Sequence, residues 1–372
     1  MPSAATNSQQ RYAHIDALRA FAVALVIIEH SGISKSPGDG GVTLFFTISG
    51  FIITYLLLRE REKTGQFGIG SFYTKRLLKI FPPFLVAILL PTLIYSLSNK
   101  LDITAVATQV LFSFNWYMIF VRDWTAAVLP GTGILWSLAI EEQFYIVLAL
   151  IWILVARRNS AVRSLVTVAV TGLVIAEASR VFGLTMLTGD FARSFLLRST
   201  TTRMDAILFG VLIAVAYLRI NAGGLVRLRH VVGQSAIPYI CVIAFPLLSF
   251  LRDESWGEFL LRPVLTAIVA ALFILYGLLA EETRTLSLFR RVVEVRWIQY
   301  FGLASYSLYL TSDPLVTALR PYLTGLPFLA KFILGIVICV VPGLLLYRFV
   351  EIPVLTLRKR LTARMPRRTL KA

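Results

Sequence analysis

Apolar segments long enough to cross a lipid bilayer recur along almost the whole chain. A membrane-spanning helix needs about 20 mostly apolar residues, and ten windows of this kind can be found. They lie near residues 12–30, 41–58, 81–97, 134–156, 163–183, 202–218, 231–251, 258–280, 300–320 and 327–350. The 372 residues are 57% hydrophobic and 15% charged, with a mean hydropathy of +0.75, which excludes an ordinary soluble domain.

The sequence therefore predicts an all-α, polytopic transmembrane bundle of about ten helices. We expect a single membrane-embedded domain over residues 1–372, with its core at 12–353 and a basic cytoplasmic tail at 354–372. The apolar stretch 104–121 is broken by polar residues, and we interpret it as a re-entrant or interfacial segment. If this stretch spans the bilayer, the predicted orientation of every later helix is wrong.

The distribution of lysine and arginine predicts which helix ends face the cytoplasm. With ten crossings, alternate loops and both chain ends hold 24 basic residues, and the opposite loops hold six. These six are Lys35, Lys100, Arg122, Arg193, Arg198 and Arg252. Because cytoplasmic loops carry an excess of Lys and Arg, both termini are predicted to be cytoplasmic.

The formal charge of +17 follows mostly from this topology. Basic residues dispersed over many short loops are attracted to anionic lipid headgroups, whereas a nucleic-acid-binding protein gathers them on one face. Membrane lipids are thus expected partners and nucleic acid is not. Cys241 and Cys339 lie far apart in apolar segments and are interpreted as small core residues, and no metal site is predicted.

Ionisable side chains inside the first apolar segment are the leading candidates for a functional site. Burying such a group in a membrane costs roughly 2.5 to 3.5 kcal/mol, so these groups are rare and usually face a polar cavity. Arg19 and His30 share this segment with Asp16 and Glu29. The rise along one helix separates Arg19 from His30 by about 16 Å. Arg19 is therefore expected in the inner half of the membrane and His30 near the outer surface.

Two further groups of polar residues are placed by the same topology. One group is predicted to reach the outer level of His30, on the acceptor side of a polar chamber, and consists of Glu141, Glu142, Arg203, Asp205 and Asp313. The other group precedes the third apolar segment on the inner side and consists of Lys75, Arg76 and Lys79. Such a cationic cluster can neutralise phosphates, but it is also typical of a juxtamembrane anchor, and the spacing alone does not decide.

Seven short motifs follow one another along residues 12–353. They are HIDALRA at 14–20 leading to His30, TLFFTISGF at 43–51, KRLLKIFP at 75–82, WSL at 136–138 leading to Glu141, RMD at 203–205 leading to Gly210, ASYSLYL at 304–310, and YRFVEIP at 347–353. Each motif alone is a weak signal. In this order they resemble the acyltransferase 3 family of integral membrane enzymes.

The resemblance implies transfer of an acyl group, usually acetyl from acetyl-CoA, to a hydroxyl of a carbohydrate or a similar acceptor. Bacterial enzymes of this family commonly modify envelope glycans, with a cytoplasmic donor and an acceptor reached from the far side of the membrane. A glycan or glycolipid acceptor and the bacterial cytoplasmic membrane are the corresponding expectations. Arg19, Lys75, Arg76 and Lys79 would then bind acyl-CoA.

The chemistry needs a base for the acceptor hydroxyl, and histidine is the side chain whose ordinary pKa lies nearest neutral pH. The chain has three histidines, and His14 and His230 fall at cytoplasmic boundaries, which makes His30 the predicted catalytic base. Glu141 could orient His30 as the third group of a catalytic arrangement, and Arg19 is counted with these two residues as catalytic. In the structural alternative, Glu141 and Glu142 only pair with Arg203 to hold helices together.

The sequence departs from the family pattern after Leu310. The family often has a tryptophan and a histidine before the proline there, whereas this chain reads Thr311-Ser312-Asp313-Pro314. The role of that histidine must be absent or be taken by Ser312 or Asp313.

The sequence thus predicts a membrane O-acyltransferase acting on an envelope or exported carbohydrate, with His30 as general base. One alternative is acylation of a small hydroxylated molecule such as a macrolide. Another is a transporter that moves a glycan or metabolite through the same polar interior. The acceptor, the acyl length and the oligomeric state stay open.

Overall fold

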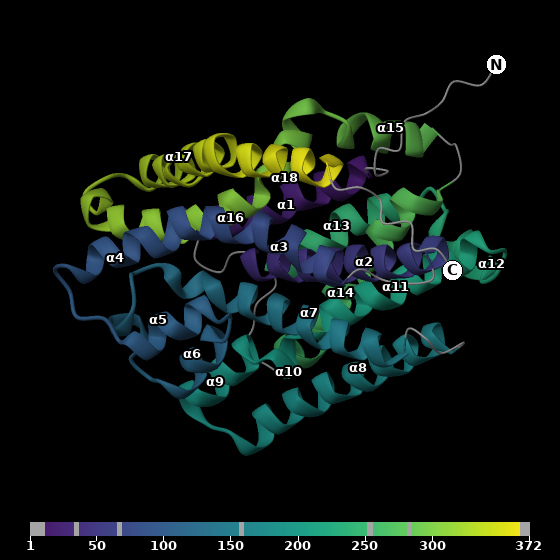
Figure 1. The fold of residues 1–372 in the computed structure, drawn as a ribbon, viewed down its shortest axis with the longest axis horizontal. Coiled ribbons are helices and arrows are strands. Elements are labelled where there is room, and N and C mark those ends of the chain that lie inside the picture. The colour runs from purple at the N-terminus through teal and green to yellow at the C-terminus, as the bar shows by residue number, and fades with distance from the viewer. Residues whose placement is uncertain are drawn as a thin grey trace.

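The computed structural model describes residues 12–32, 37–64, 69–155, 160–250, 256–280 and 284–364, which form helices and no strand (Figure 1). The predicted all-α bundle is confirmed. Part of the predicted basic tail, 365–372, lies outside the described residues. So do eight of the basic residues used to predict orientation, namely Arg11, Lys35, Arg157, Arg158, Arg252, Arg367, Arg368 and Lys371.

Long helices form the body of the bundle, and most of them run along the long axis of the molecule (Figure 1). They are α1 (Ala13–His30), α2 (Gly38–Thr64), α7 (Leu135–Val155), α8 (Ala161–Met186), α11 (Asp205–Asn221), α13 (Ile237–Phe250), α14 (Trp256–Leu279), α16 (Arg296–Leu323) and α17 (Phe328–Leu346). Two continuous runs contain a π-helical turn. They are α3 (Ile69–Phe84), η1 (Leu85–Leu89) and α4 (Leu90–Ser96), and α17, η4 (Tyr347–Glu351) and α18 (Ile352–Arg364).

Short helices connect these elements. They are α5 (Ile103–Val110), α6 (Phe114–Phe120), η2 (Trp124–Ala127), η3 (Thr132–Ile134), α9 (Gly189–Arg198), α10 (Thr200–Arg203), α12 (Val226–Val232) and α15 (Arg284–Val293). The predicted re-entrant or interfacial segment corresponds to α5 and α6, which are separated by a turn in which Phe112 has a φ of 52°. Neither helix alone is long enough to cross a bilayer.

Six helices of the described part of the chain are long and apolar enough to cross a membrane, against ten predicted windows. They are Gly38–Lys63, Phe72–Ser96, Thr132–Leu154, Ala161–Met186, Trp256–Leu279 and Phe328–Arg358. A seventh is obtained if α11 and α12, which are bent by 110°, count as one span. The predicted windows at 12–30, 231–251 and 300–320 correspond to α1, α13 and α16, which are outside these six, and the window at 202–218 corresponds to α11. In α1 this follows from the charged residues Asp16, Arg19 and Glu29, and in α13 from its 14-residue length.

Glycines let the central helices approach closely. A methyl group at Gly50 of α2 would overlap the carbonyl oxygen of Ile207 in α11, and one at Gly210 of α11 would overlap the carbonyl oxygen of Thr47. Gly302 of α16 lies in the same way against the carbonyl oxygen of Asp16 in α1. Small residues at such crossings are typical of helix packing in membranes. These contacts bring α1, α2, α11 and α16 together at the centre of the bundle.

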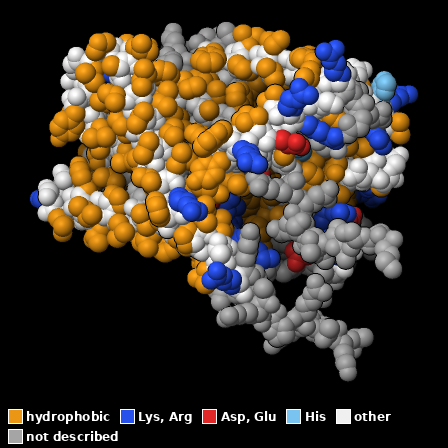
Figure 2. Space-filling model, turned by 90° about the horizontal axis from the view of Figure 1, so that it is seen from above, with side chains coloured by type: hydrophobic (Ala, Val, Ile, Leu, Met, Phe, Trp, Pro, Cys, Tyr) orange, Lys and Arg blue, Asp and Glu red, His pale blue; other side chains and the backbone are white. Residues whose placement is uncertain are grey.

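The surface separates apolar from basic side chains. In Figure 2, hydrophobic side chains cover most of one half of the visible face, whereas Lys and Arg gather toward the other end. Many large apolar residues are exposed, including Ile94, Leu154 and Val174. A contiguous apolar surface marks contact with a membrane or a partner. Ile94, Leu154 and Val174 each lie on a helix with the length and composition of a membrane span.

Candidate active site

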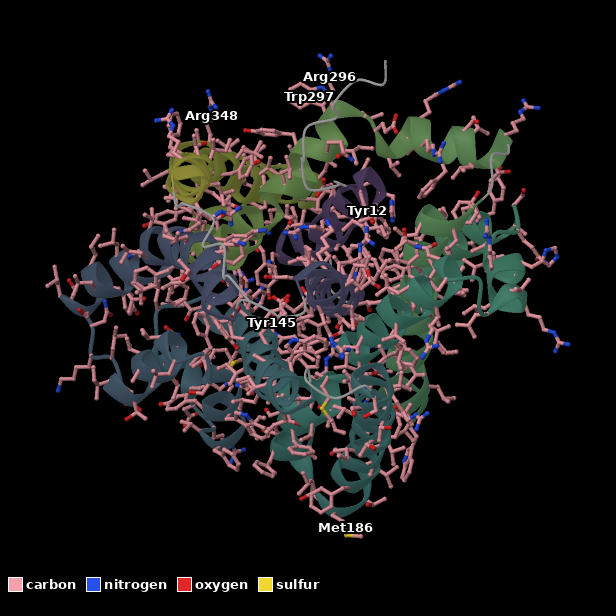
Figure 3. The ribbon with its side chains drawn as sticks, turned by 45° about the vertical axis from the view of Figure 1, so that its right-hand side comes forward. Tyr12, Tyr145, Met186, Arg296, Trp297 and Arg348 are labelled. Carbon is pink, nitrogen blue, oxygen red and sulfur yellow. The ribbon has the colours of Figure 1, made fainter. Side chains whose placement is uncertain are left out.

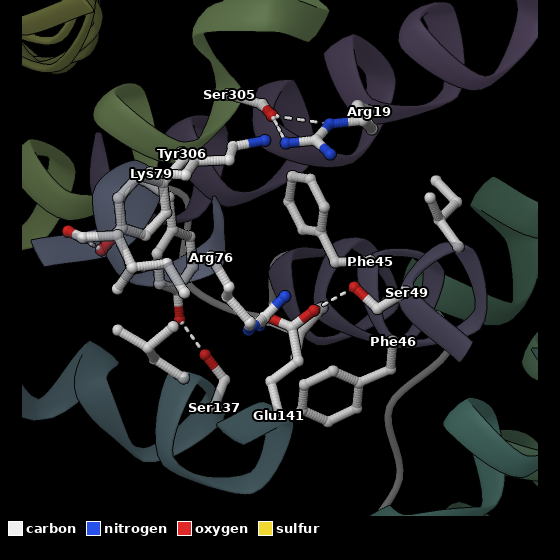
Figure 4. A pocket seen from close by; sticks show the side chains of 15 residues that line it. Arg19, Phe45, Phe46, Ser49, Arg76, Lys79, Ser137, Glu141, Ser305 and Tyr306 are labelled. Atoms are coloured by element: carbon white, nitrogen blue, oxygen red, sulfur yellow. Dashed lines mark hydrogen bonds and ion pairs between the residues drawn. The ribbon is translucent and has the colours of Figure 1, made fainter. Parts of the chain in front are cut away.

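A cavity of about 120 Å³ lies between α1, α2, α3, α7 and α16 (Figure 4). Its polar lining consists of Arg19, Ser49, Arg76, Lys79, Ser137, Glu141, Ser305, Tyr306 and Tyr309. We refer to it as the Arg19 cavity. The cavity brings together residues from five helices, and three of the predicted donor-binding residues are among them.

Arg19 is held in place by α16. Its Nε and Nη2 atoms donate to the Ser305 Oγ atom at 3.1 and 3.0 Å, and Nε also approaches the Gly302 carbonyl oxygen at 3.3 Å. Figure 4 shows the Lys79 ammonium group extending toward this guanidinium. Two cations that repel each other favour the binding of an anion between them.

Glu351 supplies a negative charge near these two cations. It is 2% exposed, accepts a hydrogen bond of 2.7 Å from Ser307, and interacts electrostatically with Lys79 and Arg19. One carboxylate offsets one of the two cations. The formal charges of Arg19, Lys79 and Glu351 therefore sum to +1, and Glu141 of the same cavity also interacts with Lys79.

Arg76 is engaged by two carboxylates of α7. Its Nε atom donates to both Glu142 carboxylate oxygens at 2.8 and 3.0 Å, and its Nη2 atom donates to Glu142 Oε1 at 2.5 Å. The Glu141 carboxylate is 3.9 Å from Nη2, and the guanidinium lies 3.5 Å from the centre of the Tyr145 ring. Arg76 is thus part of a largely buried ion pair with Glu142. Lys75, another predicted donor-binding cation, is instead exposed on the outside of α3.

Glu141 lines the Arg19 cavity and contacts Ser49 of the neighbouring helix α2. Its carboxylate accepts from the hydroxyls of Ser49 and Tyr145, the latter at 2.9 Å. The partner of the His30 ring is a different residue, Ser312. Glu141 and His30 line different cavities in the structure.

A second cavity, of about 160 Å³, lies beyond the Arg19 cavity and contains His30. Its lining includes Glu29, His30, Asp39, Trp136, Arg198 and Tyr309. We refer to it as the His30 cavity. It combines an imidazole, two carboxylates and a flat aromatic ring, which are groups able to bind and deprotonate a hydroxylated molecule.

His30 is bound by α16. Its Nδ1 atom lies 2.8 Å from the Ser312 Oγ atom, and its ring interacts electrostatically with Asp313, Glu29 and Arg320. The Asp313 carboxylate also accepts from Thr317 at 3.0 Å. The structure therefore brings Asp313 near His30.

Asp39 is clamped by two arginines at the edge of the His30 cavity. Its Oδ1 atom is 2.6 Å from Arg203 Nη2, and its Oδ2 atom is 3.1 Å from Arg262 Nη2. The Arg203 guanidinium also lies 5.4 Å from the centre of the Trp136 ring. The expected alternative pairing of Glu141 and Glu142 with Arg203 is therefore wrong, since Arg203 pairs with a carboxylate at the start of α2.

Asp205 takes part in a different buried pair, although it is only two residues from Arg203 in sequence. Its Oδ2 atom is 2.6 Å from Arg180 Nη2 on α8, and both side chains are at most 3% exposed. Asp205 is not among the residues that line either cavity. This arrangement is that of a structural ion pair between α8 and α11.

Tyr309 separates the two cavities. Together with Val42 it lines both of them, and its hydroxyl bonds to Ser137 Oγ at 2.6 Å and to the Ile134 carbonyl oxygen at 2.9 Å. A group moving from Arg19 to His30 would pass this ring. The motif at 304–310 contains Tyr309, but no sequence signal indicates that its ring faces two cavities.

Other lining residues were also missed from sequence. Ser137 and Ser305 lie within the motifs at 136–138 and 304–310, and Asp39 lies in none, but no sequence signal indicates that these three residues line a cavity. Their positions depend on contacts between distant segments. In the described part of the chain, no group of three or more His, Cys, Asp or Glu residues could hold a metal ion.

These features define a membrane-embedded helical protein with two neighbouring polar cavities, one lined by cations and one containing an imidazole. Comparison with known families identifies the family: residues 12–348 match the model of the acyltransferase domain. The chain therefore belongs to the acyltransferase 3 family. The family resemblance noted from the ordered motifs is confirmed.

Two curated relatives come from Staphylococcus aureus. The chain is 27% identical over 353 residues to O-acetyltransferase OatA of strain NCTC 8325 / PS 47, and 30% identical over 358 residues to a putative O-acetyltransferase, SACOL0978, of strain COL. Each alignment covers 91% of this chain and 56% of the relative, so the chain spans a little over half the length of the relatives it matches. No solved structure matches the chain significantly.

Proposed function

We propose that the protein moves an acetyl group from cytoplasmic acetyl-CoA to a hydroxyl of an envelope or exported carbohydrate. In this proposal the chain crosses the bacterial cytoplasmic membrane ten times, with both termini in the cytoplasm. One observation carries the proposal. A single helix, α1, contributes Arg19 to one cavity and His30 to the next, and the two cavities meet at Tyr309. Membership of the acyltransferase 3 family supports the same chemistry.

The Arg19 cavity would receive the acyl end of the donor. Its volume of about 120 Å³ is below the roughly 300 to 1,000 Å³ of pockets that enclose a drug-sized ligand, so the nucleotide would stay outside. Arg19 and Lys79 would bind a phosphate or the polar pantetheine arm, and the exposed Lys75 would attract the nucleotide phosphates. The ion pair of Arg76 with Glu142 would hold α3 against α7 at this entrance.

His30 would act as general base on the acceptor. Its imidazole takes the proton of the attacking hydroxyl while the oxygen forms a bond to the thioester carbonyl carbon. The carbon–sulfur bond then breaks, CoA leaves as the thiolate, and the imidazolium returns the proton to the sulfur. The products are the acetyl ester and free CoA, and the base is regenerated. None of these reaction steps requires a metal ion.

The His30 cavity has the lining expected for a carbohydrate. Glu29 and Asp39 offer carboxylate oxygens to sugar hydroxyls, and Trp136 offers a flat apolar face to a sugar ring. Ion pairs with Arg203 and Arg262 hold the Asp39 carboxylate in position. A small hydroxylated acceptor such as a macrolide would use the same groups, and analysis of the product distinguishes the two.

The experiment uses membranes that contain the protein, radiolabelled acetyl-CoA and an extract of envelope glycans. We expect His30→Ala to lower transfer by about 100-fold or more, with the protein still inserted. His230→Ala is the matched control, since His230 is an exposed histidine outside both cavities, and it should retain full transfer. Undiminished transfer by His30→Ala would refute the assigned base, and movement of a glycan without consumption of acetyl-CoA would favour a transporter.

A further inference from the structure

We propose that Ser312 is a positioning residue that holds the neutral His30 imidazole in the one tautomer able to act as a base toward the His30 cavity. The inference rests on the proposed function. It assigns to a serine of this chain the task left open where the sequence departs from the family pattern.

The assignment follows from counting protons. A serine hydroxyl carries one hydrogen atom, and the Ser312 Oγ atom lies 2.8 Å from the Tyr309 carbonyl oxygen, which can only accept. The same Oγ atom lies 2.8 Å from His30 Nδ1. Because its hydrogen atom is directed to the carbonyl, Ser312 can offer only a lone pair to the ring. His30 Nδ1 must therefore be the donor.

A neutral imidazole carries one N–H group. With the hydrogen on Nδ1, the Nε2 atom on the opposite side of the ring keeps its lone pair. The nitrogen that is free to take a proton is thus the one turned away from α16. When His30 becomes protonated, the Nδ1–H group keeps its bond to Ser312, so the ring does not need to turn during transfer.

Ser312 is itself rigidly held. Its side chain is fully buried, and its carbonyl oxygen accepts a weak hydrogen bond of 3.5 Å from the Cys339 thiol of α17. Ser312 is not among the residues that line the two cavities, whereas His30 is. Ser312 therefore acts through the histidine and not on the acceptor.

The neighbouring charges act on the ring without a hydrogen bond. Asp313, Glu29 and Arg320 interact with it electrostatically, which mainly changes the stability of the charged imidazolium, whereas Ser312 Oγ is in direct hydrogen-bond contact with Nδ1. The hydrogen bond to Ser312 chooses between the two neutral tautomers because it is directional.

The test compares Ser312→Ala, which removes the oxygen, with Ser312→Thr, which keeps it. We expect Ser312→Ala to lower kcat by about tenfold or more, a part of the 10²- to 10⁴-fold contribution of a general base, with unchanged KM values for acetyl-CoA and acceptor. Ser312→Thr should restore kcat to near the wild-type value. Thr324→Ala is the control, because Thr324 makes the same kind of bond to a carbonyl three residues earlier on α16, outside both cavities.

The outcomes separate this inference from the proposed function. If His30→Ala abolishes transfer while Ser312→Ala keeps the wild-type kcat, the positioning role is refuted and the base stands. If Ser312→Thr is as impaired as Ser312→Ala and both unfold at lower temperature in detergent, Ser312 serves packing alone and the inference also fails. If His30→Ala is fully active, the proposed base is wrong and the inference is refuted along with it.

Discussion

Replacing Arg76 by methionine distinguishes a structural cation from a donor-binding one. Methionine is similar in length but has no charge, so Glu142 would lose its bidentate partner and Glu141 its nearby cation. The side chains of Arg76 and Glu142 are 19% and 12% exposed, so water can replace little of the lost interaction. Removing one partner of a buried pair costs about 3 to 5 kcal/mol, and we expect Arg76→Met to lower the free energy of unfolding by this amount.

The same change would have a different effect if Arg76 mainly bound the donor. In that case KM for acetyl-CoA would rise and stability would change little. The assay is reversible unfolding in mixed detergent micelles, followed by tryptophan fluorescence, together with donor KM in native membranes. Arg348→Met is the control, since Arg348 extends away from the bundle (Figure 3), and it should change stability by less than about 0.5 kcal/mol.

The double variant Arg76→Met with Glu142→Gln tests the reasoning further. Because the second change removes the unpaired carboxylate, the double variant should be more stable than Arg76→Met alone, with a coupling energy of about 1 kcal/mol or more. The explanation is refuted if Arg76→Met unfolds like the wild type, or if the two changes simply add.

Three further predictions concern other parts of the molecule. Gly50→Ala should destabilise the crossing of α2 and α11 by about 1 to 3 kcal/mol, because the added methyl group overlaps the Ile207 carbonyl oxygen; the detergent unfolding assay measures it. Tyr309→Ala should join the two cavities and admit water to the thioester, so that more CoA is released than acetyl is transferred, as a thiol reagent would record. Hydrogen bonds from the Tyr117 hydroxyl and a backbone N–H hold the pKa of Asp102 below its ordinary value. The stabilising effect of Asp102 is thus present above its unfolded pKa near 4 and lost as pH falls through the folded pKa, and thermal unfolding of Asp102→Asn should converge with the wild type in acid.

Each of these predictions has a result that contradicts it. Gly70→Ala is the control for Gly50→Ala, because a methyl group at Gly70 meets open space, and equal stability of the two variants would refute the close approach of α2 and α11. Strict one-to-one release of CoA and transfer of acetyl by Tyr309→Ala would show that its ring does not separate the cavities. A stability difference for Asp102→Asn that does not depend on pH would remove the role given to its charge.

Local sequence patterns were sufficient to predict the helical class and to place Arg19 and His30 at different positions along one helix. They were less reliable for counting membrane spans. Charged residues in α1 and the short length of α13 make these helices poor candidates by composition, although both were predicted as apolar windows. A helix with a polar interior face and neighbours on several sides can be embedded without being uniformly apolar, so hydropathy alone is a weak guide to such helices.

The sequence was also a weak guide to which charges pair. Glu141 and Glu142 are adjacent, but successive residues of a helix point about 100° apart. Glu142 therefore forms the bidentate pair with Arg76, whereas Glu141 accepts from Ser49 and lies 3.9 Å from Arg76. Arg203 and Asp205 likewise face different partners. Residues that are close in sequence therefore lie close together on one helix, but they do not necessarily contribute to the same site.

The sequence by itself determined the membrane class, the family and the separation of a cation from an imidazole along one helix. These properties reside in composition, motif order and helical rise, each of which belongs to a single segment. Only the tertiary structure decided that Ser312 contacts His30, that Asp39 is clamped by two arginines and that Tyr309 stands between two cavities. The physical reason is that these contacts depend on the rotation and crossing of helices distant in sequence, which close packing around glycines such as Gly50 and Gly302 sets.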